Sequence, residues 1–208
     1  NSWNFLASLN LRYYMLLGFK GFVGSFAWLL IPTLLLVAAS YEESGLSILF
    51  GILGVLFAIP IFGTLLFLQT HFSVDGKLIR FVEVGQVWRN FGRAPIAHLF
   101  ALTVSLVLAL PLFLLKIETI PNELLWTLSL VFIIFSWPAR LALGWAYRRG
   151  KTATRSRRWW LRYPMLLASV PVAFAFAIIL TLTRYVSWNG ALSLFENHVF
   201  LLPAPFWL

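Results

Sequence analysis

Long apolar runs separated by short polar segments dominate the pattern of this chain. Four runs contain no charged residue, at positions 21–39, 46–70, 96–115 and 164–183. A fifth run, 124–139, is shorter and ends at Arg140. A helix rises about 1.5 Å per residue, so about 20 residues cross the hydrocarbon core of a bilayer. Each of the four long runs is therefore long enough to span a membrane as a helix.

The short run also reads as a span once polar residues at its ends are included. An arginine at the bilayer centre costs about 2.5–3.5 kcal/mol on insertion scales, so we expect Arg140 at the membrane interface. We therefore predict an all-α fold, a polytopic integral membrane helical bundle that forms a single membrane domain over residues 1–208. Its five transmembrane helices are predicted at about 21–39, 46–70, 96–115, 122–140 and 164–184.

Three further segments have helical amphipathic patterns but do not read as spans. In 77–91, polar residues recur every three or four positions, with Gly92 as a candidate C-cap and Pro95 opening the next helix. We weigh two interpretations of this segment equally: an interfacial helix that contacts lipid or a partner, and a helix that packs on the ends of its own spans. Segments 3–17 and 187–201 are predicted as interfacial helices in the same way.

Composition sharpens the class. Hydrophobic residues make up 61% of the chain and charged residues 11%, whereas a soluble domain carries about 25% charged residues. A water-soluble domain and a disordered chain are therefore excluded. The chain has no cysteine, which excludes disulfides, thiolate metal sites and cysteine nucleophiles.

The distribution of positive charge predicts the orientation. With the N-terminus inside, the cytoplasmic segments carry 14 Lys and Arg residues and the outer segments carry two. The net charge of +9 is therefore explained by an N-in/C-out orientation in the membrane. It does not indicate nucleic-acid binding. Localisation in a bacterial inner (plasma) membrane is expected.

Most of these basic residues cluster on the predicted cytoplasmic side. We interpret them as contacts for anionic lipid headgroups or for the acidic surface of a partner subunit. The set is Arg80, Arg89, Arg93, Arg140, Arg148, Arg149, Lys151, Arg155, Arg157, Arg158 and Arg162.

Small residues recur at every fourth position in two spans. One stripe comprises Ala97, Ala101, Ser105 and Ala109, and the other comprises Ser169, Ala173 and Ala177. Because lipid provides little hydrophobic drive between helices, small residues that let backbones approach closely favour association. We expect these stripes to pack inside the bundle, with an oligomer contact as the alternative.

Candidate chemistry is sparse. His71 and His98 lie near the same predicted interface, where a bis-histidine haem or a chlorophyll magnesium is conceivable, although isolated interfacial histidines are far commoner. No metal site, P-loop, dinucleotide-binding fingerprint or nucleophile elbow occurs in the sequence.

The sequence therefore favours a non-catalytic membrane subunit or scaffold of a larger membrane protein complex, with lipids and other membrane subunits as partners. The alternative is a component of a small-molecule or ion transporter or channel. A proline in every apolar run favours that alternative, whereas the lack of acidic residues in the runs disfavours it. Because the chain starts at Asn1, we also expect cytoplasmic residues upstream of it.

Overall fold

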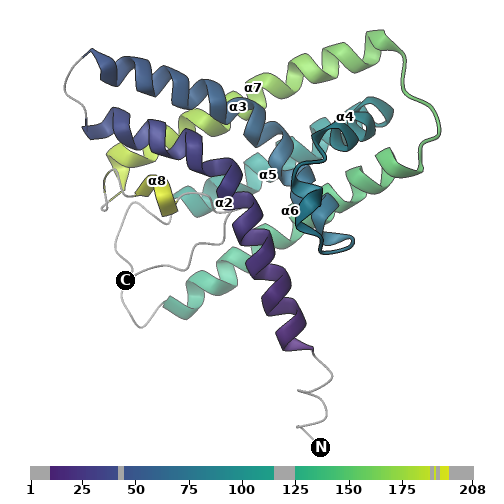
Figure 1. Cartoon of the computed structure of the whole chain (residues 1–208), viewed down its shortest axis with the longest axis horizontal. Coiled ribbons are helices and arrows are strands. Elements are labelled where there is room, and N and C mark those ends of the chain that lie inside the picture. The colour runs from purple at the N-terminus through teal and green to yellow at the C-terminus, as the bar shows by residue number, and fades with distance from the viewer. Residues whose placement is uncertain (1–9, 42–44, 115–124, 188–189, 191–192, 197–208) are drawn as a thin grey trace, which may run out of the picture.

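The computed structural model describes residues 10–41, 45–114, 125–187, 190 and 193–196. All the regular elements in these ranges are helices (Figure 1). They are α2 (Leu11–Tyr41), α3 (Leu46–Ser73), the short 3-10 helix η1 (Leu78–Phe81), α4 (Val84–Arg93), α5 (Pro95–Leu114), α6 (Leu125–Thr152), α7 (Trp159–Val186) and α8 (Ser193–Glu196).

Five of these helices, α2, α3, α5, α6 and α7, are long and apolar enough to cross a membrane. The all-α class and the number of transmembrane helices are thus confirmed, and the chain is an integral membrane protein. Pro95 opens α5 as predicted. A proline suits the first helical position because its missing N–H would have had no partner there.

The fourth span departs from its predicted bounds. We expected it to end at Arg140, but α6 continues for 12 residues beyond this arginine, to Thr152. The guanidinium of Arg140 donates a hydrogen bond to the side-chain oxygen of Gln69 on α3. A charge held by a neighbouring helix does not have to reach the headgroups, so the helix can run on.

The predicted amphipathic helix at 77–91 is interrupted, giving η1 and then α4. Phe81 ends η1 with its ring turned inward, 3% exposed, and packed on Phe72 of α3 with ring centroids 5.1 Å apart. The indole N–H of Trp28 on α2 donates to the backbone oxygen of Phe81 at 3.0 Å. These tertiary contacts outweigh the helical periodicity, and the segment packs on the ends of its own spans.

The two other amphipathic segments lie only partly within the described residues. Residues 11–17 of the predicted helix 3–17 form the start of α2, which runs without a break into the first span. Residues 1–9 lie outside the described ranges. Of segment 187–201, the structure describes Ser187, Gly190 and the single turn α8, and the remainder lies outside.

Helix α3 occupies the centre of the bundle. It contacts α2 along its length and crosses α7, while α5 packs against α6 and α7 (Figure 1). Leu65 and Leu68 of α3 are fully buried, as are Ala101 of α5 and Ala177 of α7. Small side chains at these crossings bring the helix backbones close together.

Candidate functional site

One end of the bundle collects most of the polar chemistry of the protein. Here α3 and α6 end, α5 and α7 begin, and η1, α4 and the 153–158 connection lie across them. We call this the basic end, because its segments hold most of the chain's 16 Lys and Arg residues. It is the side that the charge distribution predicts to be cytoplasmic.

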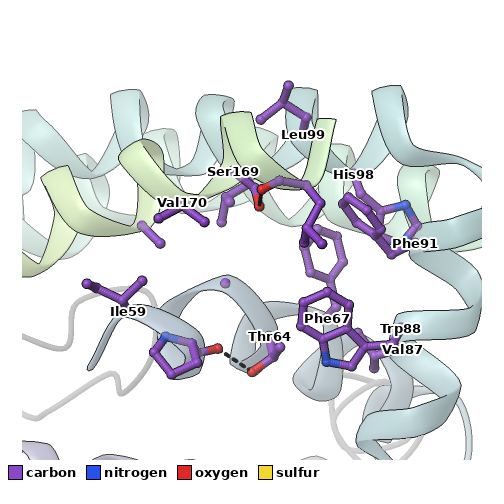
Figure 2. Close-up of a pocket in the computed structure, with 15 residues that line it drawn as sticks. Ile59, Thr64, Phe67, Val87, Trp88, Phe91, His98, Leu99, Ser169 and Val170 are labelled. Atoms are coloured by element: carbon purple, nitrogen blue, oxygen red, sulfur yellow. Dashed lines mark hydrogen bonds between the residues drawn. The ribbon is translucent and has the colours of Figure 1, made fainter. Parts of the chain in front are cut away.

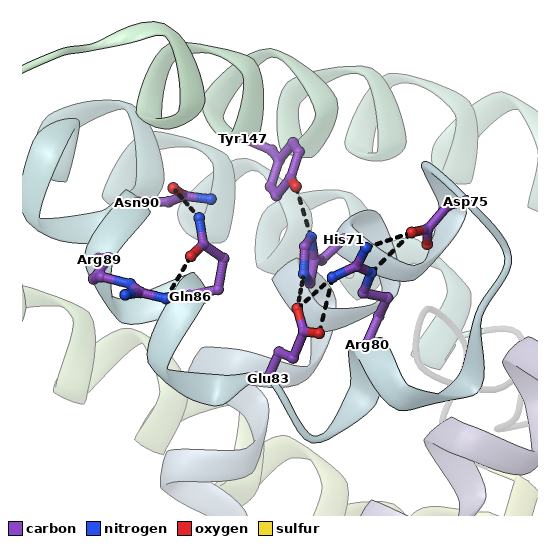
Figure 3. Close-up of polar contacts among 8 residues, drawn as sticks. All are labelled: His71, Asp75, Arg80, Glu83, Gln86, Arg89, Asn90 and Tyr147. Atoms are coloured by element: carbon purple, nitrogen blue, oxygen red, sulfur yellow. Dashed lines mark hydrogen bonds and ion pairs between the residues drawn. The ribbon is translucent and has the colours of Figure 1, made fainter.

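A chain of ion pairs and hydrogen bonds crosses the basic end (Figure 3). The guanidinium of Arg80 lies between two carboxylates, 2.6 Å from Asp75 Oδ2 and 2.8 Å from Glu83 Oε2. The other contact of Glu83 is with His71 Nε2, at 2.7 Å, and His71 Nδ1 lies 2.6 Å from the hydroxyl of Tyr147. The network therefore ties the end of α3 to the η1–α4 segment and to α6.

The charges in this network stabilise one another. The hydrogen bond from His71, followed by that from Arg80, holds the pKa of Glu83 below its ordinary value. The hydrogen bond from Arg80 likewise lowers the pKa of Asp75. The hydrogen bonds that Arg80 donates to Asp75 and to Glu83 raise the pKa of Arg80 itself. Since an ionised carboxylate only accepts hydrogen bonds, the Nε2 atom of His71 carries the hydrogen and donates a hydrogen bond to Glu83.

This geometry argues against the bis-histidine haem site. Both ring nitrogens of His71 are engaged, by Tyr147 and Glu83, so neither is free to bind iron. His98 Nδ1 donates to the Ala94 carbonyl at 2.9 Å, and its ring is enclosed by Phe67 and Phe91. Among the described residues, no group of three or more His, Cys, Asp or Glu side chains could hold a metal ion.

A second polar chain joins three spans below the first. Arg140 of α6 donates to Gln69 of α3, and the Gln69 amide nitrogen donates to the Ser25 hydroxyl of α2 at 2.7 Å. The sequence grouped Arg140 with the headgroup-binding arginines. The structure instead gives it a partner inside the bundle. Gln69 and Ser25 lie in uncharged runs, and no periodic signal marked them.

Most of the remaining basic side chains lie on the outer surface of this end, whereas Arg93 and Arg162 are half-buried. Arg148, Lys151, Arg155, Arg157 and Arg158 are exposed. The exposed Arg149 places its guanidinium over the Trp145 ring, 4.7 Å from the centroid, and the exposed Arg89 donates to Gln86 at 2.7 Å.

The 153–158 connection is held against the end of α4. The Gly92 carbonyl accepts two hydrogen bonds, from the Arg157 backbone N–H at 2.9 Å and from the Ser156 hydroxyl at 3.0 Å. The Arg162 guanidinium lies so close to Gly92 that a Cβ there would sit 3.3 Å from Arg162 Cζ. Gly92 was predicted as a C-cap, but it lies inside α4, whose C-cap is Ala94. Its small size admits Ser156 and Arg162.

Beneath this contact lies a partly open apolar cavity of about 160 Å³, lined by α3, α4, α5 and α7. Figure 2 shows Trp88, Phe91 and His98 at one end of it, and Ile59 and Val170 at the other. The two hydroxyl groups in its lining, Thr64 and Ser169, donate to carbonyls of their own helices at 2.7 Å. They therefore present little unsatisfied polarity to the cavity.

The predicted small-residue stripes lie within the bundle. Ala97, Ala101, Ser105 and Ala109 are buried, as are Ala173 and Ala177, whereas Ser169 is half-buried. Ser169 and Ala173 face the cavity opposite Gly63 of α3. The sequence did not reveal the cavity, because only the crossing of α3 and α7 brings these small residues together.

Comparisons with known proteins return no relative. No protein-family model matches this chain, and no curated protein or solved structure matches it either.

Proposed function

We propose that this protein is an integral membrane subunit, or scaffold, of a larger membrane protein complex, and that it docks to its partner through the first part of α2. The bundle is N-in/C-out in this proposal, in the inner membrane of a bacterium. The bias of Lys and Arg towards one side of the spans supports this orientation.

The observation that carries the proposal is the exposure of residues 11–23, which we call the projecting segment. This part of α2 extends away from the other long helices (Figure 1). All its side chains are exposed except Leu17 and Gly21, which are half-buried. Within the described residues, Leu17 lies beside Gly76 and Gly21 lies beside Phe72, and the other side chains of this segment are exposed.

The residues of the projecting segment suit a protein partner. Tyr13, Tyr14, Met15 and Phe19 are each more than half exposed, and aromatic and methionine side chains are enriched in protein interfaces. Gly18 lies among them, and a Cβ added there would meet no atom within 4 Å. An exposed glycine on an apolar helix permits close approach of a second transmembrane helix.

The interior supports a structural role over transport of polar solutes. The polar side chains of Ser25, Gln69 and Arg140 bond to one another across three helices, which fixes these helices in place. The cavity is lined mainly by apolar side chains. Neither arrangement offers the ordered polar groups with which a carrier replaces the water shell of an ion.

Purification from native membranes tests the proposal. The full chain, extracted in mild detergent, should co-purify with a membrane protein in fixed stoichiometry. Gly18→Leu fills the space left for the partner helix and should abolish this association, because among the described residues no atom lies within 4 Å of a Cβ at this position. Gly144→Leu is the matched control, since a Cβ on this α6 glycine also meets no atom within 4 Å, and it should retain the partner.

Two outcomes would contradict the proposal. A lone monomer in every mild detergent would exclude a stable complex, and a Gly18→Leu variant that keeps its partner would exclude docking through α2. Solute or ion flux across liposomes that contain only this chain would favour the transporter alternative.

A further inference from the structure

We infer that the apolar cavity and Arg162 form a binding site for one anionic glycerophospholipid of the leaflet next to the basic end. A segment of one acyl chain occupies the cavity, and the Arg162 guanidinium binds the phosphate. This inference does not depend on the proposed partner subunit.

The register of α7 places Arg162 at the edge of the cavity. Leu166, Ser169 and Ala173 line it, and Arg162 lies one helical turn before Leu166 on the same face. Positions i, i+4, i+7 and i+11 share one side of a helix. A helical side chain also leans towards the N-terminus of its helix, so the guanidinium extends from the cavity towards the end of the bundle.

Helix α4 closes the same edge from the other side. Trp88 and Phe91 line the cavity, and the next residue, Gly92, contacts the Arg162 guanidinium. The cavity and the arginine are therefore neighbours at the junction of α4 and α7. An apolar chamber below a cation matches a phospholipid, which carries its acyl chains directly below its phosphate.

The charge at this junction is uncompensated. Asp75 and Glu83, the acidic side chains described at the basic end, are already paired with Arg80 and His71. Arg155, Arg157 and Arg158 are exposed on the adjoining connection. A net negative headgroup, rather than a zwitterionic one, is the complement of this surface.

The size and polarity of the cavity fit part of an acyl chain. Apolar cavities of about 150 Å³ stay dry and accept small hydrocarbon groups. Thr64 and Ser169 satisfy their hydroxyls on their own helices, so a polar ligand would find no free partner in them. Gly63 adds room, since a Cβ there would meet no atom within 4 Å.

Native mass spectrometry of the full chain with defined lipids tests this site. Dioleoyl phosphatidylglycerol and dioleoyl phosphatidylcholine differ in headgroup charge but share their acyl chains. We expect one phosphatidylglycerol molecule to bind more tightly than phosphatidylcholine. Arg162→Gln should weaken phosphatidylglycerol binding about fivefold, the effect of one surface cation on an anionic lipid, and should weaken phosphatidylcholine binding less, because the choline cation offsets the charge of its phosphate. Arg158→Gln, on the exposed connection, is the control and should change phosphatidylglycerol binding less.

Filling the cavity tests the acyl-chain half of the site. Ser169→Leu should remove tight binding of both lipids, whereas Leu167→Phe, on an exposed position of α7, should not. Gly63→Ala provides a second variant. Its added methyl group has ample space, so the variant should fold like the natural protein, and it should weaken the binding of both lipids. Glycerol 3-phosphate, which has the phosphate but no acyl chain, should not compete.

Three results would overturn the inference. These are unchanged lipid binding in both Ser169→Leu and Gly63→Ala, equal effects of Arg162→Gln and Arg158→Gln, and competition by glycerol 3-phosphate as effective as that by the intact lipid.

Discussion

Arg140 of α6 donates a hydrogen bond to the side-chain oxygen of Gln69 on α3. These residues lie 71 positions apart in the chain, and their contact joins two helices that run through the same end of the bundle. Gln69 passes the connection on to Ser25 of α2. A helix that contains an arginine is thereby tied to the uncharged runs of two other helices.

Removing the glutamine should expose the energetic value of this contact. Gln69→Leu deprives Arg140 and Ser25 of a partner and should destabilise the bundle by about 1–3 kcal/mol. The midpoint of thermal unfolding in detergent measures the effect. The double variant Gln69→Leu/Arg140→Met should recover part of the loss, because it also removes the charge that has lost this hydrogen bond. A double variant less stable than Gln69→Leu would show that Arg140 contributes mainly through other contacts.

The carboxylate of Glu83 should make stability depend on pH in the acid range. Its pKa lies below the ordinary value of 4.5 because His71 and Arg80 hydrogen-bond the ionised form. A lowered pKa contributes stability above the unfolded value, and this contribution is lost as the pH falls through the folded value. The thermal midpoint should therefore drop as the pH falls below the ordinary value of 4.5.

Glu83→Gln isolates this contribution. Glutamine can still accept a hydrogen bond from Arg80, but it does not titrate, so the variant should show a shallower decline over the same pH range. Asp75→Asn removes the other carboxylate of the network whose pKa is lowered. It should also make the thermal midpoint depend less steeply on pH. Parallel curves for Glu83→Gln and the natural protein would show that this network does not contribute to acid lability.

Two glycines of α6 should respond differently to a methyl group. At Gly150 a Cβ would sit 2.7 Å from the Asn90 backbone oxygen and 3.0 Å from His98 Cε1. Gly150→Ala must push α4 and α5 away from α6, and overpacking of this kind costs about 1–3 kcal/mol. Gly144→Ala meets no atom within 4 Å and should be neutral or stabilising, since alanine favours helix over glycine. Equal thermal midpoints for the two variants would contradict this packing.

The orientation can be measured directly because the chain has no cysteine. Thr154→Cys places a thiol in the connection between α6 and α7, and Tyr41→Cys places one at the far end of α2. In cells whose outer membrane has been permeabilised, a membrane-impermeant maleimide should label Tyr41→Cys. It should label Thr154→Cys only after the inner membrane has also been permeabilised. The reverse pattern would invert the predicted topology.

Local pattern was enough for the spans and insufficient for the segments between them. Uncharged runs of membrane length predict α2, α3, α5 and α7. Such a run can enter the bilayer without a partner, because it contains no charge that would have to be paired. The segment 77–91 also has a regular helical period, yet Phe81 turns into the bundle and divides it. One aromatic ring buried between α2 and α3 outweighs a continuous surface helix, and no feature of the local sequence predicts that ring's destination.

The candidate site shows the same division. The sequence identified the basic residues at one end because their excess is a property of composition and order. It could not separate Arg140, which is paired with Gln69, from Arg162, which lies against Gly92. It also treated His71 and His98 alike, although His71 is held by Tyr147 and Glu83 while His98 is packed among aromatic rings.

By itself, the sequence determined that this protein is helical, crosses the membrane five times and concentrates its positive charge on one side. These properties depend on the free-energy cost of exposing charges and backbone polar groups to lipid. Each segment avoids this cost through its own sequence, without contacts to other segments. Only the tertiary structure decided which polar groups are satisfied, where the cavity lies and which part of α2 is exposed. Those outcomes depend on where helices cross, and a crossing joins residues that are far apart in the chain.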